Sequence, residues 1–386
     1  MAIQRIAVVS SRYPAVDQPY NHMFVHARCR QYLRAGLQVA VFVPSVDTST
    51  YEIDGVSVCR APADHISRQL GSYDTVMVHL LHLKPDPRVS GEPIYRVLAS
   101  GVAPVILFLH GVEAQPLRFR RPEEIKPLNP VSVGRWLYHD FWRLPRMAGI
   151  VSSLVEGPTP FRVVVPSRWF LEEAERGLGL SLGRCSQIIP NGIDTERFRY
   201  NPPRQDNSHD VLSIRPLYRR GKYAVDLALA TFEGWDAGLR LKLFGAGPDT
   251  EWVRRYVQRV VPSNIDLNIG FLAPDAIPAI HSTSAVYLGV TRLDAQGVSM
   301  CEAMASGLPV VSFRIDAIPE FVEHGVSGYL ADPFDLGMVR KYLVSLCMDA
   351  DLRQRFALAS RTKMESISIV KTCAAELRLA ESLFRN

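Results

Sequence analysis

Two carboxylates, Asp294 and Glu302, bracket a segment whose residue types suit the binding of an activated sugar. Between them lie a glycine and two positions expected at the start of a helix: Gly297, Val298 and Ser299. Such a glycine lets the backbone approach a ligand, and N–H groups at a helix start face anions. The carboxylates would accept hydrogen bonds from sugar hydroxyls. An acidic first turn that only complements the helix dipole would have the same pattern.

A basic pair and a glycine turn suit the phosphates of the same ligand. Arg215 and Arg220 flank a turn after an apolar run. Their guanidinium groups would grip a diphosphate bidentately and stabilise it as a leaving group. Gly245 and Gly247 form a tight turn after the next apolar run. Each segment has an ordinary alternative, because solvated basic turns and glycine turns between strand and helix are common.

The elements that position these residues are short apolar runs separated by amphipathic stretches of helical length. Several runs lack period-2 alternation, which is typical of parallel strands covered on both faces. A helix is expected over 24–33, and residues near the C-terminus place apolar side chains on one helical face. The expected strands are 6–9, 39–43, 75–79, 104–110, 149–151, 162–165, 187–190, 210–215, 239–244, 267–271, 286–290 and 309–313.

Two successive sets of strands and helices predict an α/β fold of two facing, doubly wound, Rossmann-like domains. We expect a first domain over 1–199, a turn-rich linker over 200–209 and a second domain over 210–365. A helix over 366–386 is expected to pack back on the first domain. In such folds ligands bind beyond the carboxyl ends of the strands, so the natural site is the cleft between the domains.

In this order the segments resemble the retaining GT-B glycosyltransferases of the glutamate–seven–glutamate family (glycosyl transferases group 1, family 4). The resemblance covers nearly the whole chain. The matching pieces are 109–111, 165–169, 189–194, 215–221, 244–248, 294–311 and 318–328. The resemblance implies a hexosyltransferase that moves a sugar from a nucleoside diphosphate donor to an acceptor, with retention of the anomeric configuration. It also implies that the domain over 1–199 is the acceptor side and that the domain over 210–365 binds the nucleotide sugar.

The resemblance also implies roles for individual residues. Glu302 would bind the ribose, and Asp294 would lie close to the donor sugar. Arg215 and Arg220 would hold the diphosphate. His110 matches a histidine near the transferred sugar, although a histidine that ends an apolar strand is more often structural. The other expected donor-site positions are Gly245, Gly247, Gly297, Val298 and Ser299.

Members of this family need no metal or other cofactor, and no acidic triplet of the metal-binding sort follows a strand here. The leaving phosphate itself assists attack from the same face, so no side-chain nucleophile is expected.

The chain departs from the family pattern in three places. The family usually has a glycine pair in the first strand–helix loop, whereas residues 13–23 contain no glycine. The acceptor side, where Asn21 and His22 lie, is therefore expected to differ in shape. Asp294 is one methylene shorter than the usual glutamate. Arg220 stands where the family usually has lysine, so a compact ammonium is replaced by a planar guanidinium with paired N–H donors.

The charge and cysteine content of the chain indicate which kinds of partner to expect. The formal net charge of +5, from 44 Lys and Arg against 39 Asp and Glu, is too small to indicate nucleic acid and suits an anionic small ligand. The six cysteines show neither zinc spacing nor a disulfide framework, and no signal peptide or membrane span is recognisable. We expect a cytoplasmic protein, with peripheral contact to the inner face of the membrane as the alternative.

One segment bears on that alternative. Residues 118–146 are dense in Arg, Trp and Pro, which is typical of a membrane-facing or acceptor-binding insertion with tryptophans at the lipid interface. Ordinary packing of an irregular loop with solvated arginines fits the same composition. The expected acceptors belong to bacterial polysaccharide, glycolipid or glycoside biosynthesis.

Two other functions remain open on the same architecture. A sugar-nucleotide epimerase or hydrolase would turn over the donor without an acceptor, and a non-catalytic binding protein would hold the donor without turnover. A nicotinamide-dependent oxidoreductase is disfavoured, because no Gly-x-Gly-x-x-Gly follows the first strand.

Overall fold

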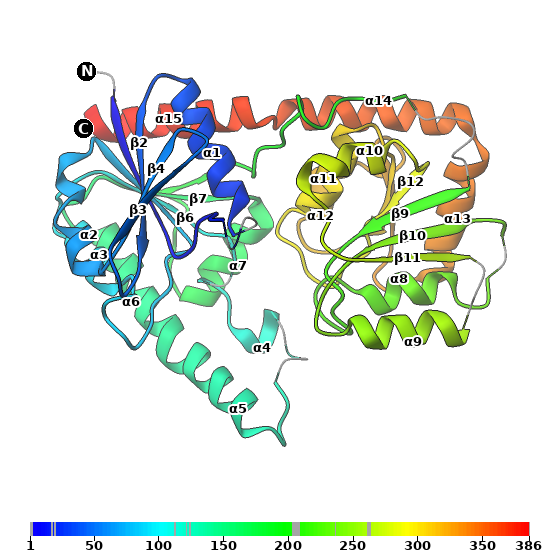
Figure 1. Ribbon diagram of the computed structural model, residues 1–386, viewed down its shortest axis with the longest axis horizontal. Helices are drawn as coiled ribbons and strands as arrows, with labels where there is room; N and C mark the ends of the chain where they lie inside the picture. Colours follow the sequence, from blue (N-terminus) through cyan, green and yellow to red (C-terminus); the bar gives the residue numbers. More distant parts are fainter. Residues whose placement is uncertain are drawn as a thin grey trace. The chain divides into compact units, whose positions relative to one another are not determined.

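The chain divides into two compact units in the computed structural model, shown in Figure 1. Unit 1 comprises Met1–Gly192 and Ile369–Asn386, and unit 2 comprises Ile193–Ser368. Residues 203–208 of the expected linker lie outside the described residues, and the predicted domain boundaries stay predictions. The described residues are 3–16, 18, 21–111, 113–120, 122, 125–202, 209–235, 237–260 and 264–385.

Unit 1 is built on an eight-stranded sheet of order β3-β4-β2-β1-β5-β6-β7-β8. Every pair is parallel except β3 with β4. The central strands β5 and β6 are buried throughout, as expected for strands covered on both faces. The strands are β1 Arg5–Ser10, β2 Gln38–Pro44, β3 Ser49–Ile53, β4 Val56–Ala61, β5 Thr75–His79, β6 Val105–Phe108, β7 Phe161–Val165 and β8 Ser186–Ile188.

Helices cover both faces of this sheet (Figure 1). Ser167 caps α7 by accepting a hydrogen bond from the Phe170 N–H, and Gly179 ends the helix in the left-handed conformation. The helices are α1 Met23–Arg34, α2 Ala63–Ser67, η1 Leu70–Ser72, α3 Glu92–Ala99, α4 Leu117–Arg120, α5 Pro130–Leu137, the π-helix η3 Tyr138–Arg143, α6 Leu144–Glu156, α7 Arg168–Leu178 and α15 Ile369–Arg385.

The C-terminal helix α15 is joined to α1 by apolar packing and a buried ion pair. Cys373 lies in the same hydrophobic core as Val25. The Nε of Arg28 donates to Glu376 Oε1 at 3.0 Å, and the Tyr32 hydroxyl donates to the other oxygen of this carboxylate. A buried ion pair is tolerated only where further hydrogen bonds satisfy it. These contacts therefore hold α15 on unit 1.

Unit 2 is built on a six-stranded, all-parallel sheet of order β11-β10-β9-β12-β13-β14. The two sheets confirm the predicted α/β fold with two parallel-sheet domains. The strands are β9 Asp210–Ile214, β10 Arg240–Gly245, β11 Ile265–Ile269, β12 Val286–Leu288, β13 Val310–Phe313 and β14 Gly328–Ala331. The helices are α8 Val225–Phe232, α9 Thr250–Val260, η5 Pro274–Ala276, α10 Ile277–His281, α11 Val298–Ala305, α12 Ile318–Phe321, α13 Leu336–Met348 and α14 Ala350–Ser366.

The strand predicted at 149–151 is wrong, because these residues belong to α6. Their apolar neighbours recur at helical spacing and are buried on one face. These residues are Leu144, Met147, Val151 and Leu154. Among the described residues, no helix is both long enough and apolar enough to cross a bilayer.

The hairpin of β3 and β4 and the edge strand β14 were not predicted. A sequence signal for the hairpin existed, since Asp54 and Gly55 form an Asp-Gly turn between two strand-like stretches. Both have positive φ, 49° and 77°, as that turn requires. The strand predicted at 267–271 begins two residues earlier, at Ile265.

Candidate functional site

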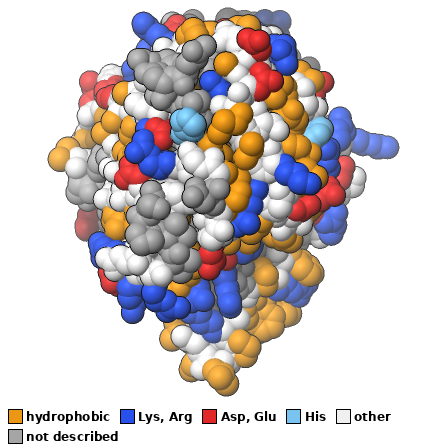
Figure 2. Space-filling model, turned by 90° about the vertical axis from the view of Figure 1, so that its right-hand side faces the viewer, with side chains coloured by type: hydrophobic (Ala, Val, Ile, Leu, Met, Phe, Trp, Pro, Cys, Tyr) orange, Lys and Arg blue, Asp and Glu red, His pale blue; other side chains and the backbone are white. Residues whose placement is uncertain are grey.

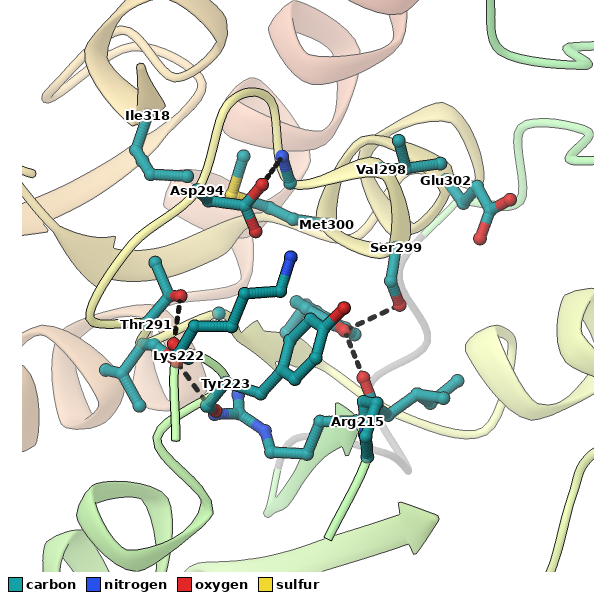
Figure 3. Close-up of a pocket in the computed structure, with 16 residues that line it drawn as sticks. Arg215, Lys222, Tyr223, Thr291, Asp294, Val298, Ser299, Met300, Glu302 and Ile318 are labelled. Carbon is teal, nitrogen blue, oxygen red and sulfur yellow. Dashed lines mark hydrogen bonds between the residues drawn. The ribbon is translucent and has the colours of Figure 1, made fainter. Parts of the chain in front are cut away.

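A pocket of about 410 Å³ lies at the carboxyl edge of the unit 2 sheet, and we call it the unit 2 pocket (Figure 3). Its volume is in the range of small-ligand sites. The ends of β9 and β12, the loop before α8 and the first turns of α11 and α12 form its walls. Six of the predicted donor-side residues line it: Arg215, Asp294, Gly297, Val298, Ser299 and Glu302.

The loop before α11 presents the start of this helix to the pocket. Gly297 has a φ of 73°, which favours glycine, and precedes the first helical residue, Val298. Asp294 Oδ1 accepts hydrogen bonds from the N–H groups of Gln296 at 3.2 Å and Gly297 at 2.8 Å. The first intrahelical bond runs from the Cys301 N–H to the Gly297 carbonyl, so the N–H groups before it are placed to bind an anion.

These capping bonds give a reason for the short side chain at Asp294. An aspartate reaches backbone N–H groups two and three residues further on, whereas the longer glutamate is not suited to this turn. The Oδ1 oxygen of Asp294 therefore acts on the loop and shapes the helix start that faces the pocket.

Glu302 lies one turn into α11, and its half-buried carboxylate points away from Lys222 (Figure 3). Burial raises the pKa of this carboxyl to about 7, while Arg197 opposes the rise and Asp194 adds to it. A carboxyl group with this pKa changes its charge near neutral pH. Its ability to accept hydrogen bonds from hydroxyls therefore depends on pH in this range.

Lys222 supplies the ammonium group that extends into the pocket (Figure 3), and the sequence had not singled it out. Its backbone carbonyl accepts hydrogen bonds from Thr291 Oγ1 at 2.7 Å and from the Arg292 N–H at 2.8 Å. The ammonium lies 4.5 Å from the centre of the Tyr223 ring. The only sequence signal was the family's usual lysine, expected two residues earlier at Arg220.

The bidentate grip on a diphosphate that was predicted for Arg215 is not available in this arrangement. Its side chain is buried, and burial lowers the pKa of its guanidinium to about 10. All three of its nitrogens donate hydrogen bonds within the protein, so they are not free for a two-pronged contact. The acceptors are Ser213 Oγ at 2.8 Å and the carbonyls of Tyr223 at 2.6 Å, Val290 at 2.7 Å and Leu288 at 2.6 Å. Arg215 thus ties three walls of the pocket together.

Arg220, Gly245 and Gly247 do not line the unit 2 pocket, contrary to expectation. Arg220 is exposed, with a φ of 58°, and its N–H donates to Asp226 Oδ1 at 3.2 Å. A Cβ at Gly245 would lie 1.9 Å from the Arg215 carbonyl oxygen, and one at Gly247 would lie 2.5 Å from another carbonyl of the same segment. The glycines therefore let the turn after β10 pack against the backbone that carries Arg215.

Ser299 joins α11 to the end of β9 through Tyr287. The Tyr287 hydroxyl lies 2.8 Å from Ser299 Oγ and donates to the Ile214 carbonyl at 3.0 Å, as the dashed lines in Figure 3 show. This tyrosine lines the pocket and was not predicted. It makes the position of the helix start depend on the central strand of the sheet.

His110 belongs to unit 1, where it follows β6 at the carboxyl edge of the sheet. Its Nε2 lies 3.3 Å from Nδ1 of His79, and its backbone N–H donates to Glu113 Oε1 at 3.0 Å. Burial, followed by the nearby Arg28, holds the pKa of His110 well below its usual value. The ring is therefore neutral near pH 7, and a neutral imidazole can donate one hydrogen bond and accept another.

The predicted acceptor-side residues also belong to unit 1. His22 has a φ of 48°, and its Nδ1 lies 2.9 Å from Ser10 Oγ. Burial lowers the pKa of His22 to about 4. Asn21 donates to Gln18 and lines a separate pocket of unit 1. Within the described ranges, no group of three or more His, Cys, Asp or Glu side chains is placed to hold a metal ion.

The part of the chain that forms the unit 2 pocket resembles a known protein family. Residues 210–349 match the family model described as Glycosyl transferases group 1. The GDP-mannose-dependent alpha-(1-6)-phosphatidylinositol monomannoside mannosyltransferase of Mycobacterium tuberculosis is 25% identical over 208 residues, 50% of this chain and 54% of that protein. The N-acetyl-alpha-D-glucosaminyl L-malate synthase of Bacillus anthracis is 28% identical over 123 residues, 32% of each chain. The match spans about half the length of the first relative and a third of the second.

Solved structures extend the likeness to both units. HepE of Anabaena in complex with UDP-glucose superposes with a TM-score of 0.69 at 14% identity, covering 99% of this chain and 100% of that chain. The sucrose-phosphate synthase of Thermosynechococcus elongatus superposes with a TM-score of 0.72 at 14% identity, covering 99% of both. Likeness at this identity shows the fold alone. The residues that line the unit 2 pocket all lie within the part of the chain that matches the Glycosyl transferases group 1 model, and the whole chain has the GT-B fold of these solved structures.

Proposed function

We propose that this chain is a retaining, metal-independent glycosyltransferase that moves a hexosyl group from a nucleoside diphosphate donor onto an acceptor. The observation that carries the proposal is the unit 2 pocket, in which Lys222, the start of α11 and Glu302 line one cavity. Lys222 and the start of α11 suit the diphosphate of a nucleotide sugar, and Glu302 suits its ribose.

In this proposal the diphosphate lies between Lys222 and the N–H groups of Val298 and Ser299. A lysine ammonium binds phosphate as a point charge, and a helix start adds partial positive charge. Both would stabilise the negative charge that develops on the departing diphosphate. Glu302, once deprotonated, would accept hydrogen bonds from the ribose hydroxyls.

Retention of configuration is proposed to follow from attack on the face that the diphosphate leaves. The acceptor oxygen forms the new bond to the anomeric carbon while the bond from that carbon to the phosphate oxygen breaks. A leaving phosphate oxygen takes the acceptor proton, so no side-chain nucleophile is required. Lys222 and the helix start would supply the positive charge that a metal ion supplies in other enzymes. Neutral His110 is proposed to hydrogen-bond the transferred sugar.

The acceptor is proposed to belong to bacterial polysaccharide, glycolipid or glycoside biosynthesis. One relative is named for a phosphatidylinositol monomannoside acceptor and another for L-malate, and a solved structure of the same fold holds UDP-glucose. These names support a nucleotide-sugar donor. A sugar-nucleotide epimerase or hydrolase, or a binding protein without turnover, would use the same pocket but transfer nothing to an acceptor.

Peripheral contact with the inner, anionic face of a membrane is part of the proposal. Residues 118–146 carry seven Lys and Arg against three Asp and Glu, which is a net +4 of the chain's +5. Hydrophobic side chains gather at the lower end of Figure 2, the end at which α5 lies in Figure 1. Exposed apolar side chains among cations suit anionic lipid surfaces. The exposed apolar residues of this segment are Phe119, Leu128, Val131, Leu137 and Phe141.

Asp140 organises this segment from its interior. Its carboxylate accepts hydrogen bonds from the Leu117 N–H at 2.6 Å and from Trp136 Nε1 at 2.8 Å. Because Asp140 is buried, its carboxylate is not exposed on the surface that would meet a membrane.

The test of the donor proposal is a thermal-shift panel against UDP, GDP, ADP, TDP and their common sugar conjugates, with and without excess chelator. A ligand at about 100 times its Kd stabilises the native state by about 2.7 kcal/mol. One responding base whose effect survives the chelator supports the proposal. A flat panel, or a response that chelator removes and a divalent ion restores, contradicts it.

A further inference from the structure

A second pocket, of about 400 Å³, lies in unit 1 at the carboxyl edge of its sheet, and we call it the unit 1 pocket. The loops after β1 and β5, the end of β2 and the side chains of β3 and β4 form its walls. Four charged side chains line it: Arg12, Arg60, Lys84 and Asp47. Among the described lining residues, three cations face a single carboxylate.

None of the three cations is paired within the described part of the chain. No carboxylate forms an ion pair with Arg12, Arg60 or Lys84 there. Asp86 lies close to Lys84 in sequence but is held by Arg88 instead, through Nε at 3.1 Å and Nη2 at 2.9 Å. Among the described residues that line the unit 1 pocket, the cations therefore exceed the carboxylates by two.

The like charges act on one another. Burial and then Arg12 lower the pKa of Lys84, and Asp86 only partly opposes this effect. Burial and then Arg12 also lower the pKa of His22, which follows Asn21 in the same loop. Cations that converge on one cavity raise its electrostatic potential and favour the entry of an anion.

We infer that the unit 1 pocket binds a phosphate group of the acceptor. Two guanidinium forks and an ammonium are the groups that bind phosphate most strongly through charged hydrogen bonds. A phosphomonoester carries about −1.5 to −2 charges, which matches the excess of two cations over carboxylates in this pocket. Asn21, which the sequence placed on the acceptor side, lines the same pocket. The inference rests on the proposed function, because it names the class of acceptor that this transferase would take.

The test is calorimetric titration of the full chain at low ionic strength. The probes are glycerol 3-phosphate, a short-chain phosphatidylglycerol, and succinate as a dicarboxylate control. Binding of glycerol 3-phosphate alone supports a free phosphomonoester acceptor, and binding of the phosphatidylglycerol alone supports a lipid phosphodiester. Binding of neither phosphate compound, or equally tight binding of succinate, overturns the inference.

Matched variants separate the pocket from general surface charge. Arg12→Gln and Arg60→Gln should each weaken phosphate binding about tenfold, the loss expected for a charged hydrogen bond. Arg34→Gln, at the exposed end of α1 and outside the pocket, should leave it unchanged. An equal loss in Arg34→Gln overturns the inference.

Donor binding in the same variants keeps the two proposals apart. Arg12→Gln should lose phosphate binding while a nucleotide sugar still raises the melting temperature, because the donor is proposed to lie in unit 2. Phosphate binding that persists in a chain that binds no nucleotide sugar would overturn the proposed transferase instead. Donor binding without any phosphate binding would overturn only the acceptor class.

Discussion

Donor binding should depend on pH through Glu302. Burial raises the pKa of this carboxyl from its usual 4.5 to about 7, so the carboxylate must lose a proton before it accepts ribose hydroxyls. The ionised fraction is about nine-tenths at a pH near 8 and about one-tenth at a pH near 6, from the titration of a single group. Affinity for the donor should therefore fall about tenfold as the pH falls from about 8 to about 6, which is a loss of about 1.4 kcal/mol of binding free energy.

The assay is calorimetric titration of whichever nucleotide sugar the donor panel identifies, at several pH values between about 6 and about 8. A nucleotide sugar is preferred to a free nucleoside diphosphate, because its esterified terminal phosphate does not titrate in this range. Glu302→Gln removes the titrating group and should bind weakly with no pH dependence. Glu323→Gln changes an exposed glutamate of unit 2 outside the pocket and should retain the dependence of the unmodified chain.

Two results would refute this reasoning. A flat affinity between about pH 6 and about pH 8 in the unmodified chain would mean that the carboxylate of Glu302 does not contact the donor. A dependence that persists in Glu302→Gln would place the titrating group elsewhere. His110 and His22 are not candidates, because burial lowers the pKa of both rings below this range.

Three further outcomes are expected. Lys222→Ala should weaken nucleotide-sugar binding about tenfold or more in the same titration, whereas Arg220→Ala should change it less than about twofold; equal losses would contradict Lys222 as the diphosphate cation. Arg215→Ala should lower the free energy of unfolding in urea by about 3 kcal/mol, because buried carbonyls lose their donor. If Arg215→Ala kept its full stability but lost nucleotide-sugar binding, Arg215 would instead contact the donor directly. Leu128→Ser combined with Val131→Ser should reduce cosedimentation with phosphatidylglycerol vesicles; unchanged binding, or equal binding to phosphatidylcholine vesicles, would refute membrane contact through this segment.

Much of the fold could be predicted from apolar periodicity. A strand covered on both faces of a parallel sheet has to be apolar throughout, so runs such as Ile6–Val9 within β1 are visible in the sequence. The same signal misled at 149–151, where a short apolar run is equally compatible with a buried helix. The edge hairpin of β3 and β4 escaped notice because exposed strands lack such runs.

The candidate site was predicted in part. The segment from Asp294 to Glu302 lines the unit 2 pocket because its glycine and helix start are local features of the chain. The sequence predicted a tight turn at Gly245 and Gly247, whereas Gly245 is the last residue of β10 and both glycines pack closely against the backbone that carries Arg215. Sequence spacing cannot tell a glycine that approaches a ligand from one that approaches another loop.

The sequence by itself determined the two α/β domains and the carboxylates and helix start of the unit 2 pocket, because each depends on local pattern. Only the tertiary structure decided which cation enters that pocket. The left-handed backbone at Arg220 leaves its side chain on the surface, while the bonds from Thr291 and Arg292 hold Lys222 at the cavity. The guanidinium of Arg215 donates hydrogen bonds to carbonyls of β12 and the loop after it. Residues so far apart along the chain meet only when the sheet has formed, and no spacing along the sequence encodes that meeting.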